Sequence, residues 1–304
     1  MMKKRTMLVF VLLTVLVFTG CAQKDNTQET VKEVEEQQTE PIDAVQELDA
    51  MLGIEETWTF ADAVGREYDM EVDLKANLNQ YDEECFYHEG EKMVYDGEGY
   101  RYRLGVDVSY YQQEIDWEKV KDAGMEFAII RLGYRGYGGS GTIKLDSRYE
   151  ENMQGAKQAG LDVGVYFFAQ AINEQEAIEE AEFVLQHLKE YDLEMPVVYD
   201  PETVLEDGAR TTGISREQFT KNAIAFCETI ERAGYKSMIY CNMLWQAFEL
   251  DMSELTEYPI WYADYNRFPQ TPYHYDIWQY TQEGTVDGIQ GNVDLNIQLI
   301  KTKK

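Results

Sequence analysis

The sequence predicts an α/β fold, a modified (β/α) barrel of about five α/β units and three terminal strands, with a small N-terminal extension. From Leu104 onward, short apolar segments alternate with helical stretches, which is typical of parallel strands joined by helices. After Tyr240 the apolar segments follow one another with turns and little helix between them. A regular eightfold barrel would alternate to its end, so the sequence favours the modified form.

The expected elements of the barrel follow one another along the chain. Strands are expected at residues 105–107, 127–132, 163–168, 196–200, 237–240, 260–262, 277–280 and 293–295. Helices are expected at about residues 116–123, 148–159, 174–189 and 215–233. Asp116 is a suitable N-cap for the first helix, and Gly124, Gly160 and Gly234 stand where glycine commonly follows a helix.

The N-terminus resembles a bacterial lipoprotein signal. Basic residues at 3–5 precede an apolar run from Met7 to Phe18, which is short for a membrane-spanning helix and typical of an export signal. Small residues then precede Cys21, as in a lipobox, although Phe18 stands where an aliphatic residue is usual. The resemblance implies a signal peptide at residues 1–20 and a lipid on the sulfur of Cys21. A plain secretory signal with an incidental cysteine is the alternative.

Two segments separate this signal from the barrel. Residues 21–50 are rich in Gln, Glu, Thr and Asp, and they cannot bury enough apolar surface to fold, so we expect an acidic disordered tether. Residues 51–103 carry aromatic residues and turn signals at Asp96-Gly97 and Glu98-Gly99. This small extension is expected to form short strands or, alternatively, an ordered lead-in arm. The barrel domain is expected at residues 104–304.

The chain is strongly acidic, which excludes one class of partner. It carries 27 Lys and Arg against 57 Asp and Glu, a formal net charge of −30. No basic stripe could follow a phosphate backbone, so nucleic acid is not expected as a partner. Cys85, Cys227 and Cys241 are an odd number without CxxC spacing, and buried thiols are expected. We expect a monomer.

A pair of acids stands at the end of one apolar strand. Asp200 and Glu202 are two positions apart, so their side chains point to one face, with Cα atoms about 6.5–7 Å apart. Two like charges held this close at the mouth of a barrel raise one pKa, as a general acid beside an ionised partner requires. Pro201 lacks the N–H for regular pairing. Acids that merely open the next loop are the alternative.

Asp107 and Asp294 also stand at strand ends. The ends of barrel strands converge on one mouth, so these two acids are expected to share a cleft with Asp200 and Glu202. Four carboxylates suit chemistry that passes through an oxocarbenium ion. They would also suit a divalent metal, but none of the three histidines lies beside them in sequence, and no metal or cofactor is expected.

Aromatic residues recur at the same strand ends, where their flat faces can stack on sugar rings. For any single one of them core packing is the more common role, but as a set they favour a carbohydrate groove over a phosphate or nucleotide site. The set is Tyr134, Tyr137, Tyr166, Phe168, Tyr199, Trp261, Tyr265, Trp278 and Tyr280. The residues expected to bind substrate are Tyr134, Tyr166, Phe168, Trp261 and Tyr265, together with Gln279.

Eight segments resemble, in order, those of the family 25 glycoside hydrolases. They are GVDVSYYQ (105–112), IDWEKVK (115–121), FAIIRLGYRGYG (127–138), AGLDVGVYFF (159–168), MPVVYDPE (195–202), WYADY (261–265), IWQYTQEG (277–284) and GNVDLN (291–296). The resemblance implies a modified barrel and a catalytic domain at residues 104–304. It also implies hydrolysis of the β-1,4 bond between N-acetylmuramic acid and N-acetylglucosamine, with peptidoglycan glycan strands as the partner.

The resemblance also implies roles for the four acids. Glu202 matches the general acid/base and Asp200 the carboxylate that stabilises the transition state, while Asp107 and Asp294 match the family's other two acids, with orienting and electrostatic roles. Pro201 stands where the family usually has an aliphatic residue. The expected reaction is retaining. A direct nucleophile is one possibility, and attack by the substrate's 2-acetamido group, whose nitrogen Asp200 would hold, is the one we favour.

Two other functions stay open on the sequence. One is a non-catalytic lipoprotein that binds peptidoglycan with the same barrel, and the other is an enzyme that cuts a chitin-like polymer. The expected location is the cell surface, at the outer face of the cytoplasmic membrane, through the lipid anchor at Cys21.

Overall fold

The computed structural model describes residues 57–189 and 191–302. The signal peptide, Cys21 and the tether expected from the sequence lie outside the described residues. In the part of the chain that is described, no helix is long and apolar enough to cross a membrane.

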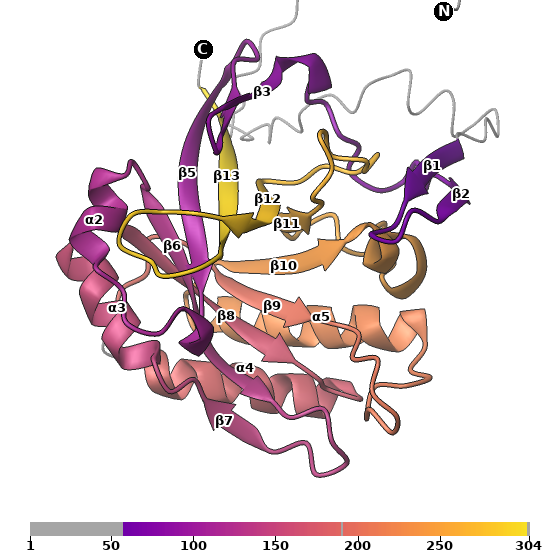
Figure 1. Cartoon of the computed structure of the whole chain (residues 1–304). Coiled ribbons are helices and arrows are strands. Elements are labelled where there is room, and N and C mark those ends of the chain that lie inside the picture. Colours follow the sequence, from indigo (N-terminus) through magenta and orange to yellow (C-terminus); the bar gives the residue numbers. More distant parts are fainter. Residues whose placement is uncertain (1–56, 190, 303–304) are drawn as a thin grey trace, which may run out of the picture. The chain divides into compact units, whose positions relative to one another are not determined.

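Eight strands close into a barrel (Figure 1). Neighbouring strands are parallel from β5 to β12, whereas β13 pairs antiparallel with both β12 and β5 and so closes the ring. The short strand β7 (Ile143–Leu145) adds to β6. The expected modified barrel is confirmed. Its strands are β5 (Tyr100–Val108), β6 (Phe127–Arg135), β8 (Asp162–Ala169), β9 (Val197–Pro201), β10 (Ser237–Asn242), β11 (Ile260–Ala263), β12 (Ile277–Gly284) and β13 (Val293–Lys301).

Helices connect the parallel strands, and all four expected helices are present. They are α2 (Trp117–Asp122), α3 (Tyr149–Gln158), α4 (Glu174–Leu188) and α5 (Arg216–Arg232). Asp116 caps α2 by accepting from the N–H of Lys119. After β10 the alternation of strands and α-helices ends. The connection to β11 contains the π-helical turn η3 (Trp245–Glu249). The remaining strands follow through turns, as the sequence indicates.

Alternation along the strands divides the core into two parts. Side chains facing outward pack against the helices in one large cluster, whereas the inward-facing side chains form a smaller cluster inside the barrel. The inner cluster contains Phe127, Ile129, Met195, Val198, Met238, Trp261 and Ile277. Residues two positions after such interior residues face the same way, one layer nearer the strand ends. The interior core therefore forms the floor on which the functional cleft is built.

Residues 57–95 of the N-terminal extension form two antiparallel hairpins. Strands β1 (Thr57–Ala61) and β2 (Glu67–Glu71) make the first, and β3 (Phe86–Glu89) and β4 (Lys92–Tyr95) make the second, with the short helix η1 (Glu83–Cys85) before it. The indole of Trp58 donates to the carbonyl of Gln270, and the hydroxyl of Tyr81 donates to that of Tyr275 at 2.8 Å. The extension thus packs on the barrel near β12 and continues into β5.

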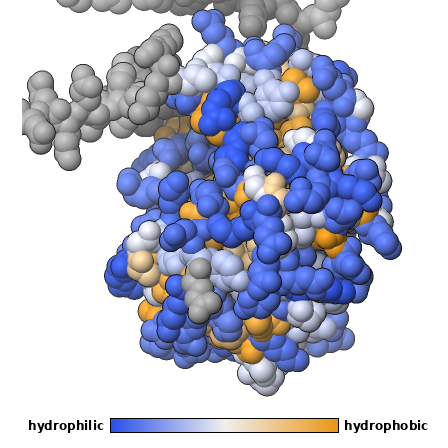
Figure 2. Space-filling model, turned by 90° about the vertical axis from the view of Figure 1, so that its left-hand side faces the viewer, coloured by the Kyte–Doolittle hydropathy of each residue, from blue (hydrophilic) through white to orange (hydrophobic). Residues whose placement is uncertain are grey.

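The surface and the cysteines agree with a chain of this composition. On the face shown in Figure 2, apolar residues occur in small groups among hydrophilic ones. Among the described residues, Cys227 and Cys241 are buried free thiols, as expected, and Cys85 is a half-buried one.

Candidate active site

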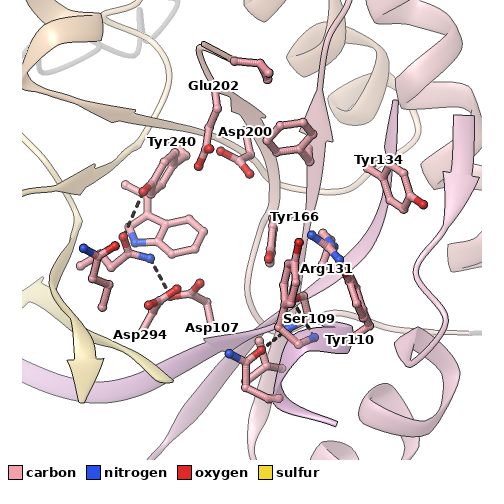
Figure 3. Close-up of a pocket in the computed structure, with 18 of the residues that line it drawn as sticks. Asp107, Ser109, Tyr110, Arg131, Tyr134, Tyr166, Asp200, Glu202, Tyr240 and Asp294 are labelled. Carbon is pink, nitrogen blue, oxygen red and sulfur yellow. Dashed lines mark hydrogen bonds between the residues drawn. The ribbon is translucent and has the colours of Figure 1, made fainter. Parts of the chain in front are cut away.

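A cleft of about 560 Å³ opens where the parallel strands end (Figure 3). All ten candidate side chains of the barrel line it, although they come from seven different strands and the loops that follow. The acids are Asp107, Asp200, Glu202 and Asp294, and the others are Tyr134, Tyr166, Phe168, Trp261, Tyr265 and Gln279. The ends of the strands converge on one mouth, as expected from the sequence. This convergence brings the ten side chains together.

Asp107 is held rigidly at the base of the cleft. One carboxylate oxygen, Oδ2, accepts from Nε2 of Gln279 at 2.8 Å and from Nδ2 of Asn296 at 2.8 Å. Burial raises the pKa of Asp107, while these two amide donors and a hydrogen bond with Asp294 oppose the rise.

Asp294 shares that hydrogen bond, and its surroundings favour its protonated form. Burial, the charge of Asp107 and the shared hydrogen bond raise the pKa of Asp294 to about 9. At neutral pH, Asp294 therefore carries a proton that it can donate to the carboxylate of Asp107. The acids at 107 and 294 act as one fixed unit rather than as two free charges.

Asp200 and Glu202 differ from Asp107 in having no such fixed partners. Asp200 is buried at the end of β9, paired in register with Phe168, and its Oδ1 has no hydrogen-bond partner within the described residues. Glu202 follows β9 and is exposed at the mouth. Figure 3 shows both carboxyl groups pointing into the same part of the cleft. Their hydrogen-bonding capacity is available to a ligand.

The same surroundings raise the pKa of both acids. Burial raises the pKa of Asp200 well above its ordinary value, and the charges of Glu202 and Asp107 add to the rise. Enclosure by the cleft walls raises the pKa of Glu202 even though part of its side chain reaches solvent, and the charge of Asp107 adds to it. Arg131 opposes both shifts. A raised pKa is what a carboxyl group needs to act as a general acid.

Comparisons with known proteins agree with this geometry. The model of the glycosyl hydrolases family 25 matches residues 106–289, more than half of the chain. The chain belongs to family 25.

This family 25 chain is similar to two curated lysozymes. It is 28% identical to the autolytic lysozyme of Clostridium acetobutylicum over 193 residues, which are 63% of this chain and 54% of that protein. It is 29% identical to lysozyme M1 of Streptomyces globisporus over 213 residues, which are 63% of this chain and 66% of that protein. The chain thus spans about half the length of the first relative and about two thirds of the second.

The fold is shared with solved structures. The modular autolysin LytC from Streptococcus pneumoniae, also solved with a synthetic peptidoglycan ligand, superposes with a TM-score of 0.59 at 24% identity. The alignment covers 79% of this chain and 56% of LytC. At this identity the likeness shows the fold alone.

Gln170 holds the backbone of Glu202 in this family 25 cleft but was not among the site residues predicted from the sequence. Its Nε2 donates to the backbone carbonyl of Glu202 at 2.8 Å, directly beyond the point where β9 ends. Gln170 is itself fixed, because its N–H donates to Glu180, its carbonyl accepts from Arg210, and its side-chain oxygen accepts from Thr211. A polar residue two positions after the apolar strand at 163–168 was the available signal.

Arg131 is the second residue that the sequence reasoning missed. Its Nε donates to Oδ2 of Asp146 at 2.7 Å, and its guanidinium lies 5.0–5.5 Å from the ring centres of Tyr110, Tyr111 and Tyr134. The signal was a lone cation inside the apolar strand at 127–132. Because Arg131 stands two positions after the interior Ile129, it faces the cleft.

Amide and aromatic side chains complete the wall beside Asp107. Tyr240, also missed, donates through its hydroxyl to Oε1 of Gln279 at 3.0 Å, and Tyr265 donates to the same oxygen at 2.8 Å. The indole of Trp261 donates to Oδ1 of Asn296 at 2.8 Å. These bonds orient the amides so that their N–H groups face Asp107.

Three aromatic residues expected at the cleft lie elsewhere. Tyr199 is buried against Phe226 of α5, and Trp278 and Tyr280 are buried beside the N-terminal extension. Strand alternation is the reason, since Tyr199 precedes the inward-facing Asp200 and must face outward. These three pack in the core, which is the role that the sequence favours for any single aromatic residue of the set. Tyr137 does line the cleft, with 40% of its surface exposed.

Within the described ranges, no group of three His, Cys, Asp or Glu side chains is arranged to hold a metal ion.

Proposed function

We propose that this protein is an N-acetylmuramidase that hydrolyses the β-1,4 bond between N-acetylmuramic acid and N-acetylglucosamine in peptidoglycan with retention of configuration. The observation that carries the proposal is the state of Asp200 and Glu202 in a family 25 barrel. Both line the cleft, both have raised pKa values, and Asp200 has a buried oxygen without a partner. Such an oxygen can accept the N–H of a 2-acetamido group.

In the proposed first step, the carbonyl oxygen of the 2-acetamido group bonds to the anomeric carbon while the glycosidic bond breaks. Glu202 gives its proton to the departing oxygen. Asp200 accepts a hydrogen bond from the acetamido N–H and stabilises the positive charge that develops on the ring intermediate. In the second step, Glu202 removes a proton from water, whose oxygen bonds to the same carbon while the bond between that carbon and the acetamido oxygen breaks. Two displacements leave the configuration unchanged.

Because both pKa values are raised, substrate binding can change which of Asp200 and Glu202 carries the proton. A hydrogen bond donated to the carboxylate of Asp200 favours its ionised form. Ionised Asp200 then disfavours ionisation of Glu202, with which it is electrostatically linked. The shared proton is thereby kept on Glu202, the group that must donate it.

Reducing ends released from purified cell walls test the activity. We expect new ends that carry muramic acid, and much slower release from a polymer that lacks the lactyl group. Binding without new reducing ends would favour the non-catalytic alternative, and equal cutting of both polymers would favour a chitin-type specificity. A substrate with hydroxyl in place of the acetamido group should turn over far more slowly, and unchanged turnover would count against assistance by the substrate.

For location, we propose a lipoprotein held at the outer face of the cytoplasmic membrane by a lipid on Cys21. The support is the sequence of the first 21 residues, with its basic start, apolar run and small residues before the cysteine. Two or three acyl chains would give a stable anchor. The acidic segment at residues 21–50 would then let the barrel reach the wall.

A further inference from the structure

The cleft poses an electrostatic problem. The chain has a formal net charge of −30, and four carboxyl groups line the cleft. The proposed substrate is also anionic, because muramic acid bears a lactyl carboxylate and its peptides bear carboxylates. Like charges repel across a weakly hydrated site, so a cation is needed wherever a substrate carboxylate enters.

Two arginines line the cleft, and one of them is already occupied. Arg135 donates to Oε1 of Glu180 at 2.7 Å, to the carbonyl of Gly141 at 3.1 Å and to that of Glu176 at 2.9 Å. All three of its nitrogens are thus used within the protein. Arg131 is the remaining candidate among the residues that line the cleft.

One edge of the Arg131 guanidinium is fixed and another is free. Nε is paired with Asp146, which is itself held by the backbone N–H groups of Tyr110 and Arg148 at 3.2 and 2.9 Å. Nη2 is buried and has no hydrogen-bond partner among the described residues. Leaving a buried charged donor unpaired is costly, and the cost is removed when an acceptor binds.

Three tyrosine rings surround the Arg131 guanidinium. The rings of Tyr110, Tyr111 and Tyr134 lie close to the guanidinium and favour its charge without accepting an in-plane hydrogen bond. A planar guanidinium edge pairs best with a planar carboxylate, which can take two parallel N–H bonds. Tyr111 is 67% exposed and lines the cleft, so the group of rings around the guanidinium reaches the cleft opening.

We propose that Arg131, with Tyr110, Tyr111 and Tyr134, forms a subsite that binds a carboxylate of the glycan substrate. The identity of the substrate rests on the proposed function. The carboxylate has two possible sources: the lactyl group of a muramic acid freed of peptide, or the peptide attached to it. The subsite would let an acidic cleft accept an acidic polymer, and it would separate muramic acid polymers from neutral ones.

Binding measured without turnover tests this subsite separately from the activity. The ligands are soluble glycan fragments with free lactyl carboxylates, and the same fragments after conversion of these groups to methylamides. A second pair carries peptides, with free or methylamidated carboxylates. Binding of each is measured by calorimetry to the Glu202→Gln protein, with and without Arg131→Gln. We expect methylamidation within one pair to weaken binding about tenfold, roughly one charge-assisted hydrogen bond, and Arg131→Gln to abolish that difference.

Arg103 provides a matched control, because its side chain is 13% exposed against 11% for Arg131 and it too is paired with a carboxylate and lies over an aromatic ring. It does not line the cleft, so Arg103→Gln should keep the full difference between free and methylamidated ligands. Arg131→Lys keeps the charge and loses the planar edge, so it should lose most of the difference. It replaces the glutamine variant if that variant fails to fold.

The pair of ligands that shows the difference identifies the source of the carboxylate. If methylamidation changes binding equally with arginine and with glutamine at position 131, the proposed subsite is wrong, whether or not the enzyme cuts peptidoglycan. If the difference depends on Arg131 but no reducing ends are released by the unmodified protein, the subsite stands and the proposed hydrolysis is wrong.

Discussion

Asp294 lies directly opposite Asp107 where the antiparallel strands β13 and β5 close the barrel. Like charges at opposed positions destabilise a strand pair. The structure avoids this cost because burial and the neighbouring charge raise the pKa of Asp294 to about 9, so that one of the two acids is neutral. Closure of the barrel and protonation of the cleft are therefore linked at this pair.

The first prediction concerns Asp294→Asn and pH. The folded protein holds this proton where the unfolded chain, with a pKa near 3.8, has released it. Its contribution to stability is complete below that value and is lost as the pH rises toward 9. Asparagine stays neutral and can still donate to Asp107. The melting temperature of the variant should therefore rise relative to the parent between pH 5 and pH 8.5, as followed by circular dichroism.

Glu118→Gln, at an exposed position on α2, removes one negative charge away from the cleft. The melting temperature of this control relative to the parent should change little over the same range. An Asp294→Asn protein that behaves like this control would mean that no linkage exists between the two acids.

The second prediction concerns the amide that joins Trp261 to Asp107. Asn296 is fully buried, accepts from the indole of Trp261 and donates to Asp107. Asn296→Leu leaves the buried indole N–H of Trp261 without its acceptor and removes one of the two amide donors to Asp107, so the free energy of unfolding should fall by about 2 kcal/mol or more. Urea denaturation measures this change. For the control Asn292→Leu, at an exposed position before β13, the free energy of unfolding should fall by much less.

The third prediction concerns Gln170 as a positioning residue. Gln170→Leu removes the hydrogen bond to the carbonyl of Glu202, so kcat on peptidoglycan should fall about tenfold with little change in KM, since Glu202 is needed in the transition state. Asn222→Leu is matched, because Asn222 is also a buried amide that donates to a backbone carbonyl, that of Ala171. Equal losses in kcat for the two variants would reduce Gln170 to a general role in stability.

The fourth prediction concerns the lipid anchor. Cys21→Ser removes the sulfur to which the lipid would be attached, so the protein should move from the membrane fraction to the medium. Fractionation of cells and quantification by immunoblot measure the change. Cys85→Ser changes a cysteine outside the signal and should leave the distribution unaltered. A Cys21→Ser protein retained at the membrane to the parental degree would rule out this anchor.

The acids of the cleft could be predicted because each stands at the end of an apolar strand, and barrel strands converge. The same alternation would have excluded Tyr199, since Asp200 beside it faces inward. Applied to residue 131, which follows the interior position 129, it would have added Arg131. Both positions follow from the face of the strand on which the side chain lies, which residue type alone does not indicate.

Other features depend on contacts that no local pattern carries. Trp58 donates to Gln270, which lies 212 positions further along the chain, so the packing of the extension could not be derived from the segment itself. Gln170 reaches the carbonyl of Glu202 because β8 and β9 are neighbours in a particular register, which pairs Ala169 with Pro201. Registers of this kind follow from the whole sheet.

Release of reducing ends by the Glu202→Gln protein decides whether Glu202 is the proton donor. Glutamine keeps the shape and removes the transferable proton, so the rate on peptidoglycan should fall by about 10²–10⁴-fold or more with the fold intact by circular dichroism. Glu206→Gln changes a carboxylate on the same loop that instead accepts from Tyr137 at 3.0 Å, and it should keep most of the parental rate. A folded Glu202→Gln protein that digests peptidoglycan at the parental rate would contradict the proposed mechanism at its centre.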